Sequence, residues 1–224
     1  MTAIFLTATG TEIGKTFVAA GLIHALKRKG REVAAIKPLV SGYEDWSAPA
    51  SDPVRLLDAL GLPHTEDEVA KIAPWRFRAP LAPNLAASRE GRHLNYDALL
   101  EFCRAAAAAC PGALLIEGIG GVMVPIDERR TVLDWIADLH VPALLVAGSY
   151  LGTISHTLTA LATLRQRQVP VAAIVLSETE GSSVPLEDNA AAIAQFSHGV
   201  PVLSLPLLLP GMEHATFAAL ADLV

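Results

Sequence analysis

The residues best suited to chemistry are a glycine-rich segment and a few lysines and carboxylates. The segment Ala8-Thr9-Gly10-Thr11-Glu12-Ile13-Gly14-Lys15-Thr16 lies between a predicted strand and a predicted helix. Its last three residues match the end of the pattern G-x-x-x-x-G-K-[ST]. In this pattern backbone N–H groups point at phosphate oxygens, the lysine approaches the β- and γ-phosphates, and the hydroxyl can ligate Mg²⁺. We therefore expect Lys15 and Thr16 in a phosphate site.

The match to this pattern is imperfect at its first glycine. The general form requires glycine at position 9, where this chain has Thr9, and a form one residue longer requires it at position 8, where the chain has Ala8. The alternative is a glycine turn that starts a helix and carries an incidental lysine. The strand–loop–helix context favours the phosphate loop.

Other unusual residues follow predicted strands. Lys37-Pro38-Leu39-Val40-Ser41-Gly42 follows the second strand, Glu117-Gly118-Ile119-Gly120-Gly121 a later one, and Leu151-Gly152-Thr153-Ile154-Ser155-His156 the next. Ligands of open α/β sheets bind outside the carboxyl ends of the strands. Each segment also has a plain structural interpretation as a solvated strand end, an ordinary turn or a cap. Their common position favours one shared site.

Short apolar runs alternate with amphipathic helical patterns along the chain. This alternation predicts an α/β fold with a mostly parallel sheet and helices on both faces. The expected strands are 3–7, 33–36, 113–117, 143–147, 171–176 and 202–205. The expected helices are 15–29, 96–109, 131–139, 153–168, 187–197 and 214–222. We expect one domain over 1–224, with a loop-rich insertion at about 43–93, where six prolines occur.

Composition excludes several classes of protein. The 224 residues are 52% hydrophobic and 18% charged, which excludes a disordered chain. The net charge of −6 disfavours a nucleic-acid partner, and the basic cluster Lys27-Arg28-Lys29 fits a solvated helix end. No apolar run is long enough to span a membrane. Cys103 and Cys110, about 10 Å apart on one predicted helix, cannot form a disulfide, so we expect a reduced, cytoplasmic protein.

The phosphate loop, the three segments above and Ser88-Arg89-Glu90-Gly91-Arg92 occur in an order and spacing that resemble the dethiobiotin synthetase family. The resemblance covers nearly the whole chain and implies a P-loop NTPase fold. It implies that 7,8-diaminopelargonate takes up CO₂ as a carbamate, which attacks the γ-phosphate of ATP. The second amine then closes the cyclic urea of dethiobiotin, with ADP and phosphate released. It also implies a homodimer with substrate near the interface.

The resemblance implies roles for matched positions, with Lys37 and Lys15 as catalytic residues. The implied ATP-binding residues are Glu12, Ile13, Gly14, Lys15, Thr16, Phe17, Asp52, Glu117, Gly118, Ile119, Gly120, Ser177, Pro206, Leu207 and Leu208. The implied substrate-binding residues are Thr11, Lys37, Ser41, Gly152 and Thr153, the last two through N–H groups at a helix start. The implied Mg²⁺ ligands are Thr16, Asp52 and Glu117. Asp45 competes with Asp52, which could instead cap a helix over 53–60. We expect a locally cationic site.

Four departures from the family pattern stand out. Ala8 replaces a loop glycine, which matters only if that position needs a positive φ. Ala82 and Asn84 stand where the family has serine and histidine, and Tyr150 stands where a lysine can occur. Ser177-Glu178 replaces an Asn-Asp pair that reads the adenine ring. Because serine cannot make the paired contact of an amide, we predict weakened preference for ATP over other nucleoside triphosphates.

Three alternative functions remain open. A P-loop switch ATPase would hydrolyse ATP to drive partner binding, but usually carries a second lysine early in the loop, and positions 8–13 hold none. An amidating ligase domain would normally be followed by a glutaminase domain. A nucleotide-binding paralogue without ligase activity is suggested by Ala8 and Ser177. Retention of Lys37, Ser41 and Glu117 favours the ring-closing ligase.

Overall fold

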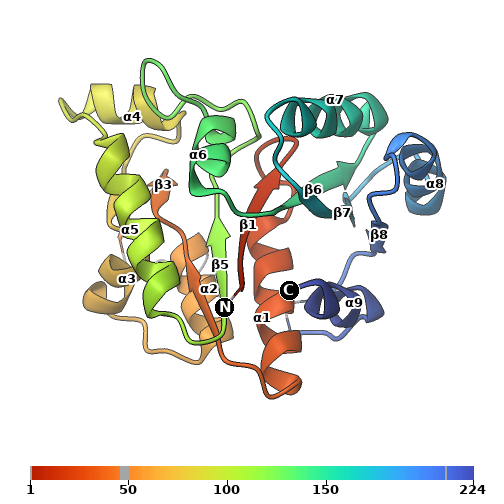
Figure 1. Ribbon diagram of the computed structural model, residues 1–224, viewed down its shortest axis with the longest axis horizontal. Coiled ribbons are helices and arrows are strands. Elements are labelled where there is room, and N and C mark those ends of the chain that lie inside the picture. The colour runs from red at the N-terminus through yellow and green to blue at the C-terminus, as the bar shows by residue number, and fades with distance from the viewer. Residues whose placement is uncertain (1, 46–50, 210) are drawn as a thin grey trace.

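The first strand lies in the middle of the sheet that organises the molecule. The computed structural model describes residues 2–45, 51–209 and 211–224. β1 (Thr2–Ala8) pairs in parallel with β5 (Ala113–Glu117) on one side and with β6 (Ala143–Ser149) on the other. β2 (Val33–Ile36) flanks β5, while β7 (Val171–Glu178) and β8 (Val202–Leu205) extend the other side. The order is β2-β5-β1-β6-β7-β8, all parallel, so the carboxyl ends of these strands meet at one edge (Figure 1).

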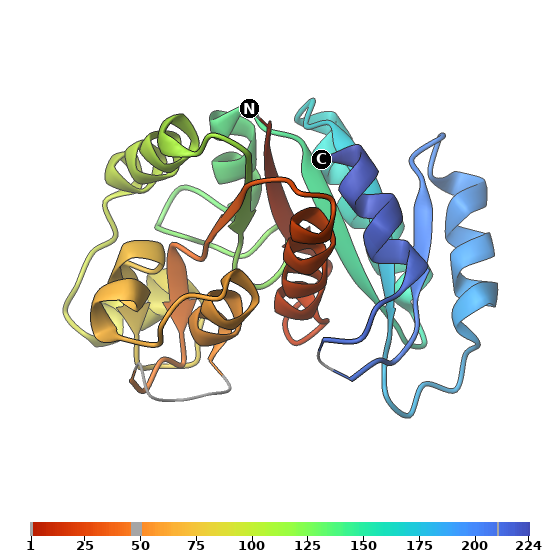
Figure 2. The ribbon, with the colours of Figure 1, turned by 90° about the horizontal axis from the view of Figure 1, so that it is seen from below.

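Helices cover both faces of this sheet. α1 (Lys15–Arg28) and α9 (Ala215–Leu223) lie on one face, and α6 (Val132–Leu139) and α7 (Thr153–Gln166) lie on the other (Figures 1 and 2). α5 (Tyr96–Ala109) packs beside α6, and α8 (Leu186–Phe196) packs beside α7 and β8. The expected α/β fold with a parallel sheet is confirmed. Over the residues described, no helix combines the length and apolarity needed to cross a membrane.

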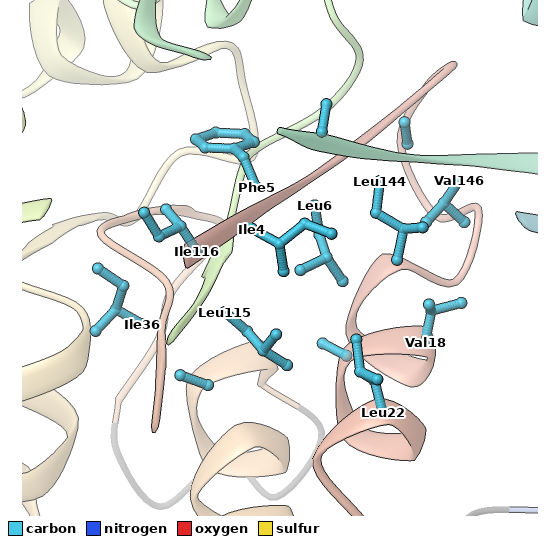
Figure 3. Close-up of a cluster of buried hydrophobic side chains, with 14 of the residues drawn as sticks. Ile4, Phe5, Leu6, Val18, Leu22, Ile36, Leu115, Ile116, Leu144 and Val146 are labelled. Carbon is cyan, nitrogen blue, oxygen red and sulfur yellow. The ribbon is translucent and has the colours of Figure 1, made fainter. Parts of the chain in front are cut away.

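Strand alternation gives each face its own core. Ile4 and Leu6 point toward Val18 and Leu22 of α1, whereas Phe5 points to the opposite side (Figure 3). There Phe5 packs edge-to-face on Trp135 of α6, with ring centroids 4.8 Å apart. The strands β5 and β6 are buried along their whole length, as expected for central strands of a parallel sheet. This rigid centre fixes the loops that leave β1 and β5.

The expectation of a loop-rich insertion at 43–93 is wrong for the residues described. This stretch carries α2 (Asp52–Leu60), α3 (Glu66–Ile72), β4 (Trp75–Phe77) and α4 (Pro83–Arg89). β4 pairs in parallel with β3 (Leu39–Ser41) in a second, two-stranded sheet. The physical reason lies in the prolines: Pro53 and Pro83 occupy the first turns of α2 and α4, where the missing N–H costs nothing.

The basic cluster at the end of α1 makes hydrogen bonds to neighbouring helices in addition to contacting solvent. Lys27 donates hydrogen bonds to the carbonyls of Ala59 and Leu60 at the end of α2. Arg31, just beyond the cluster, donates to the carbonyl of Ala221 in α9 at 3.0 Å. Cations complete the unpaired carbonyls of helix ends, so this region fastens α2 and α9 to α1.

Candidate active site

The phosphate loop connects β1 to α1 and is held by sheet hydrogen bonds at its start. The Thr9 N–H donates to the Val146 carbonyl at 3.0 Å, and the Ala8 carbonyl accepts from Val122 at 3.0 Å. Ala8 is buried in β1 and is not among the residues with positive φ. A glycine is therefore not required at position 8, and this departure leaves the loop unstrained.

The end of the phosphate loop requires glycine at position 14, and the next residue, Lys15, lies against the loop. Gly14 has φ 92° at the N-cap of α1, and a Cβ there would lie 3.2 Å from Ser177 Oγ. Lys15 Nζ donates to the Gly10 carbonyl at 3.1 Å and to the Gly120 carbonyl at 2.9 Å. Lys15 thus joins the phosphate loop to the segment that follows β5.

A buried ion cluster forms where β2 and β5 end. Lys37 Nζ lies 2.7 Å from Glu117 Oε1 and 3.0 Å from Asp52 Oδ2. It also donates to the Gly118 carbonyl at 2.9 Å. The Thr16 hydroxyl donates to the same Oε1 of Glu117 at 2.7 Å. Lys37 and Glu117 are almost fully buried, whereas the Asp52 side chain is 40% exposed. Residues from four segments of the chain therefore converge on one charged centre.

The electrostatics of this cluster follow from burial and proximity. Burial opposes the charge of Lys37, but Glu117 and Asp52 outweigh it, so the pKa of Lys37 lies above its ordinary value. Burial also opposes ionisation of Asp52, but Lys37 outweighs it and its pKa lies below the ordinary value. Lys15 has no carboxylate that close: burial, then repulsion from Lys37, lowers the pKa of Lys15 to about 8. These shifts favour the charged forms of both Lys37 and Asp52, whereas Lys15, with a pKa of about 8, loses its charge as the pH rises through that value.

A cavity of about 640 Å³, called the phosphate cavity below, opens onto this cluster. It brings together most of the residues expected at the site: Thr11, Glu12, Ile13, Gly14, Lys15, Thr16, Phe17, Lys37, Ser41, Asp52, Glu117, Ile119 and Gly120. Gly118 is not part of this lining, and a Cβ at this position would lie 2.6 Å from the Phe5 ring. The phosphate loop and the Lys37 cluster therefore share one cavity.

The charge of the cavity differs from the cationic site we expected. Its charged lining consists of Lys15, Lys37 and Arg55 and of Glu12, Asp52 and Glu117. Three cations face three carboxylates, so the described lining is balanced rather than cationic. The reason is that the lysines were expected to face only anionic ligands, whereas Lys37 is itself neutralised by protein carboxylates.

The oxygen atoms in this cavity suit Mg²⁺. Thr16, Asp52 and Glu117 converge there, and Glu117 Oε2 is buried with no hydrogen-bond partner among the residues described. Mg²⁺ typically takes one or two carboxylates and keeps waters or phosphate oxygens in its remaining positions. Within the described chain, no cluster of three or more His, Cys, Asp or Glu side chains is placed to hold a metal. Asp45 is not part of the cavity lining, which favours Asp52.

A second cavity of about 370 Å³, called the base cavity below, lies next to the first and shares four of its lining residues: Glu12, Ile13, Gly14 and Phe17. The residues expected around the base line it: Ser177, Pro206, Leu207 and Leu208. Glu178 Oε2 accepts a hydrogen bond from the Leu207 N–H at 2.9 Å and so holds this segment against β7. The two cavities are therefore adjacent and reach from the ion cluster to the segment after β8.

Gly152 and Thr153 are not brought together with the other expected residues. Neither lines the two cavities described above. The Thr153 N–H donates to the Tyr150 carbonyl at 3.0 Å, and its buried hydroxyl donates to the Gly148 carbonyl. Within one chain, these two residues therefore make no contact with the ion cluster.

Several lining residues were missed by the sequence reasoning. The phosphate cavity adds Val40, Gly42, Arg55 and Pro80, and the base cavity adds Thr179 and Glu180 beyond the Ser177-Glu178 pair already singled out. Val40 and Gly42 flank the predicted Ser41, so their position was within reach. Arg55 lies three residues after Asp52, and this helical spacing is the signal that could have found it.

Comparison with known proteins agrees with this geometry. Residues 2–210 match the family described as AAA domain. The chain is 51% identical to an ATP-dependent dethiobiotin synthetase from Methylobacterium nodulans, over 91% of this chain and 92% of that protein. It is 49% identical to one from Caulobacter sp. strain K31, over 99% of this chain and 94% of that protein.

Solved structures share the fold at low sequence identity. The signal recognition particle receptor FtsY from Elizabethkingia anophelis superposes with a TM-score of 0.53 and 12% identity, over all of this chain and 65% of that one. A MinC:MinD cell division complex from Aquifex aeolicus gives a TM-score of 0.52 at 12% identity, over 99% of this chain and 86% of that one. These likenesses concern the fold alone. By its sequence relatives, the chain belongs to the AAA-domain family and, within it, to the ATP-dependent dethiobiotin synthetases.

Proposed function

We propose that this protein is a ligase that closes the ring of dethiobiotin in biotin biosynthesis, using ATP, Mg²⁺, CO₂ and 7,8-diaminopelargonate. The observation that carries the proposal is the buried Lys37 cluster in the same cavity as the phosphate loop. Relatives of about half identity over nearly the whole chain carry this activity in their names. The chemistry requires two anions to meet, a carbamate and a terminal phosphate, and a cation between them lowers their repulsion.

The reaction proceeds in three balanced steps. One amine of the substrate adds to CO₂ and loses a proton, which gives a carbamate. A carbamate oxygen then attacks the γ-phosphorus, the bond to the β-phosphate oxygen breaks, and ADP leaves. The second amine attacks the carbonyl carbon of the mixed anhydride, loses a proton and expels phosphate, which closes the cyclic urea. Lys37 neutralises the carbamate and the transferred phosphoryl group, and Lys15 neutralises charge on the phosphate chain.

Thr16, Asp52 and Glu117 are the residues that would hold Mg²⁺. The ion supplies charge neutralisation for the phosphate oxygens when it is bound. The protein residues prepare the site before Mg²⁺ binds. The Thr16 hydroxyl and Lys37 orient Glu117, and Lys37 keeps Asp52 ionised. The two oxygen-donor carboxylates are thus fixed in position and charge at the phosphate end of the cavity.

The substrate extends from this cavity toward a second copy of the chain. Thr11 and Ser41 lie in the cavity beside Lys37, whereas Gly152 and Thr153 lie outside it. A homodimer would bring the start of α7 from one subunit to the cavity of the other, where the positive end of the helix dipole could attract a carboxylate. Two free buried cysteines and small diffusible substrates fit a cytoplasmic enzyme.

One assay tests this function directly. Purified protein is incubated with ATP, Mg²⁺, bicarbonate and the diamino acid, and ADP and the cyclic urea are quantified together. We expect equal amounts of both products and no ADP when the diamine is omitted. ADP formation that does not depend on the diamine would favour a switch ATPase instead, and binding of ATP without any turnover would favour an inactive paralogue.

A further inference from the structure

Arg55 is a cation of the phosphate cavity to which no role has been given. It lies on α2 three residues after Asp52, on the same side of the helix. It lines the phosphate cavity together with Lys37 and Glu117. It also lines a neighbouring cavity of about 330 Å³ between α1, α2 and the segment before α9, whose wall includes Thr16 and Phe17. Arg55 therefore stands on the rim that separates the two cavities.

The helices that carry Arg55 and the phosphate loop are fixed side by side (Figure 2). The ion pair of Asp52 with Lys37 holds the start of α2, and Lys27 of α1 caps its end at Ala59 and Leu60. α2 thus runs alongside α1 with its first turn at the site. One turn of helix rises about 5.4 Å, a distance that the long arginine side chain can span back toward the phosphate loop.

The charges of the phosphate cavity indicate why a third cation is needed there. Without it, Lys15 and Lys37 would face three carboxylates, Glu12, Asp52 and Glu117, in a cavity that must receive a polyanion. Lys37 is already paired with two of these carboxylates, and Lys15 donates to two carbonyls. Among the residues described, none accepts a hydrogen bond from the Arg55 guanidinium or forms an ion pair with it. It is the cation in this described lining that keeps its donors available.

We propose that Arg55 binds phosphate oxygens of the nucleotide from the α2 side, opposite the phosphate loop. A guanidinium presents several donors in a planar fork and stays charged at every working pH, which suits recognition of phosphate. Arg55 thereby adds positive charge to a lining in which Lys37 is also paired with Glu117 and Asp52. This inference rests on the nucleotide site alone and not on ring closure.

Nucleotide binding without the diamine tests this role. The affinities of Arg55→Gln, Arg55→Lys and wild-type protein for ATP with Mg²⁺, and for inorganic tripolyphosphate, are measured by calorimetry or competition. We expect Arg55→Gln to bind both ligands about tenfold more weakly, as for the loss of one charged hydrogen bond. Arg55→Lys should recover part of the loss, and binding by Arg55→Gln should depend less on salt.

Arg28→Gln is the matched control, because Arg28 lines the neighbouring cavity but not the phosphate cavity and is paired with Glu213. Its affinity for both ligands should equal that of the wild type. The proposal is overturned if Arg55→Gln binds ATP within twofold of the wild type, if it loses affinity for ATP but not for tripolyphosphate, or if Arg28→Gln loses as much. Since no ring closure is measured, these outcomes stand apart from those of the ligase assay.

Discussion

The two ends of the proposed nucleotide site are built on different physical principles. At the phosphate end, Lys37 and Glu117 are buried and lie at the ends of β2 and β5, two neighbouring parallel strands. At the base end, the lining segment after β8 is held by a hydrogen bond from the Leu207 N–H to Glu178. Leu207 is 57% exposed. One end is buried and built around an ion cluster, and the other is exposed at Leu207.

This difference suggests that the phosphate end serves catalysis and the base end serves recognition of the nucleotide base. Charges that must meet a developing transition state gain most when they are fixed before the reaction in a region of low dielectric. Base recognition adds binding energy that need not change during the reaction. We therefore expect substitutions at the phosphate end to affect catalysis strongly and substitutions at the base end to affect selectivity mildly.

The largest effect is expected from Lys37→Met. This change removes the cation proposed to lie between carbamate and phosphate, so ring closure should fall by about a thousandfold or more, while ATP affinity changes less than about tenfold. The assay measures cyclic urea formation, and calorimetry measures ATP binding. Because Glu117 loses its buried partner, the variant should also be less stable by about 3–5 kcal/mol.

Lys27→Met controls for loss of a lysine elsewhere, since Lys27 caps α2 far from the reacting groups. Circular dichroism at a temperature below both unfolding transitions separates lost catalysis from lost fold. A folded Lys37→Met protein that closes the ring at the wild-type rate would remove Lys37 from the mechanism.

Glu117→Gln should produce the next largest effect. It removes one of two carboxylates placed for Mg²⁺, so the Mg²⁺ concentration needed for tight ATP binding should rise about 10- to 100-fold. Titration of Mg²⁺ at fixed ATP measures this shift. Glu12→Gln removes a carboxylate from the same cavity outside the proposed metal ligands and should leave the Mg²⁺ dependence unchanged. Equal shifts in both variants would argue for a general charge effect.

The pH dependence of ATP binding should come from Lys15. With a pKa of about 8, Lys15 loses its charge as the pH rises through that value, whereas Lys37 stays protonated. ATP stabilises the charged form, so its affinity should be constant well below pH 8 and fall by up to about tenfold per pH unit above it. Calorimetry in buffers of different ionisation enthalpy should show proton uptake above pH 8.

Lys15→Arg tests this assignment because arginine remains charged throughout the range. Its ATP affinity should be almost independent of pH between 7 and 9. A wild-type affinity that does not change over this range would show that Lys15 is already fully charged in the free protein.

Ser177→Asn is expected to have the smallest effect. An amide can make a paired contact with a base, which one hydroxyl cannot, so the variant should prefer ATP over other nucleoside triphosphates about fivefold more than the wild type does. Competition among nucleotides for the purified proteins measures the ratio. Equally steep discrimination by the wild type and the variant would contradict relaxed base selectivity.

Strong periodicity made most of the fold predictable. The apolar runs of β2, β5 and β8 appear at the expected residues, and α5 spans its predicted range. The small sheet of β3 and β4 was missed because each strand has three residues, too few for an alternating pattern. α3 and α4 were missed because proline was interpreted as ending structure, whereas Pro83 begins a helix.

The residues of the candidate site likewise divide into those that could be predicted from the sequence and those that could not. Residues at or directly after the ends of strands, such as Glu117 and Lys37, could be predicted because the sheet brings strand ends together. Arg55 could not be found by that rule, since it reaches the cavity from a helix whose docking depends on tertiary contacts. The balanced charge of the lining was also hidden, because the pairing of Lys37 with Asp52 depends on a distance in space rather than in sequence.

The central place of β1 has a consequence for how the chain acquires its fold. Its two neighbours, β5 and β6, begin more than a hundred residues later in the sequence. During synthesis from the ribosome, β1 would stay unpaired on both edges until those strands emerge. Such long-range pairing slows folding, because the chain must close large loops before it gains contacts. A nascent fragment that ends before Ala113 would therefore lack a competent phosphate loop, and protection of Phe5 and Leu6 amides from hydrogen exchange should develop late.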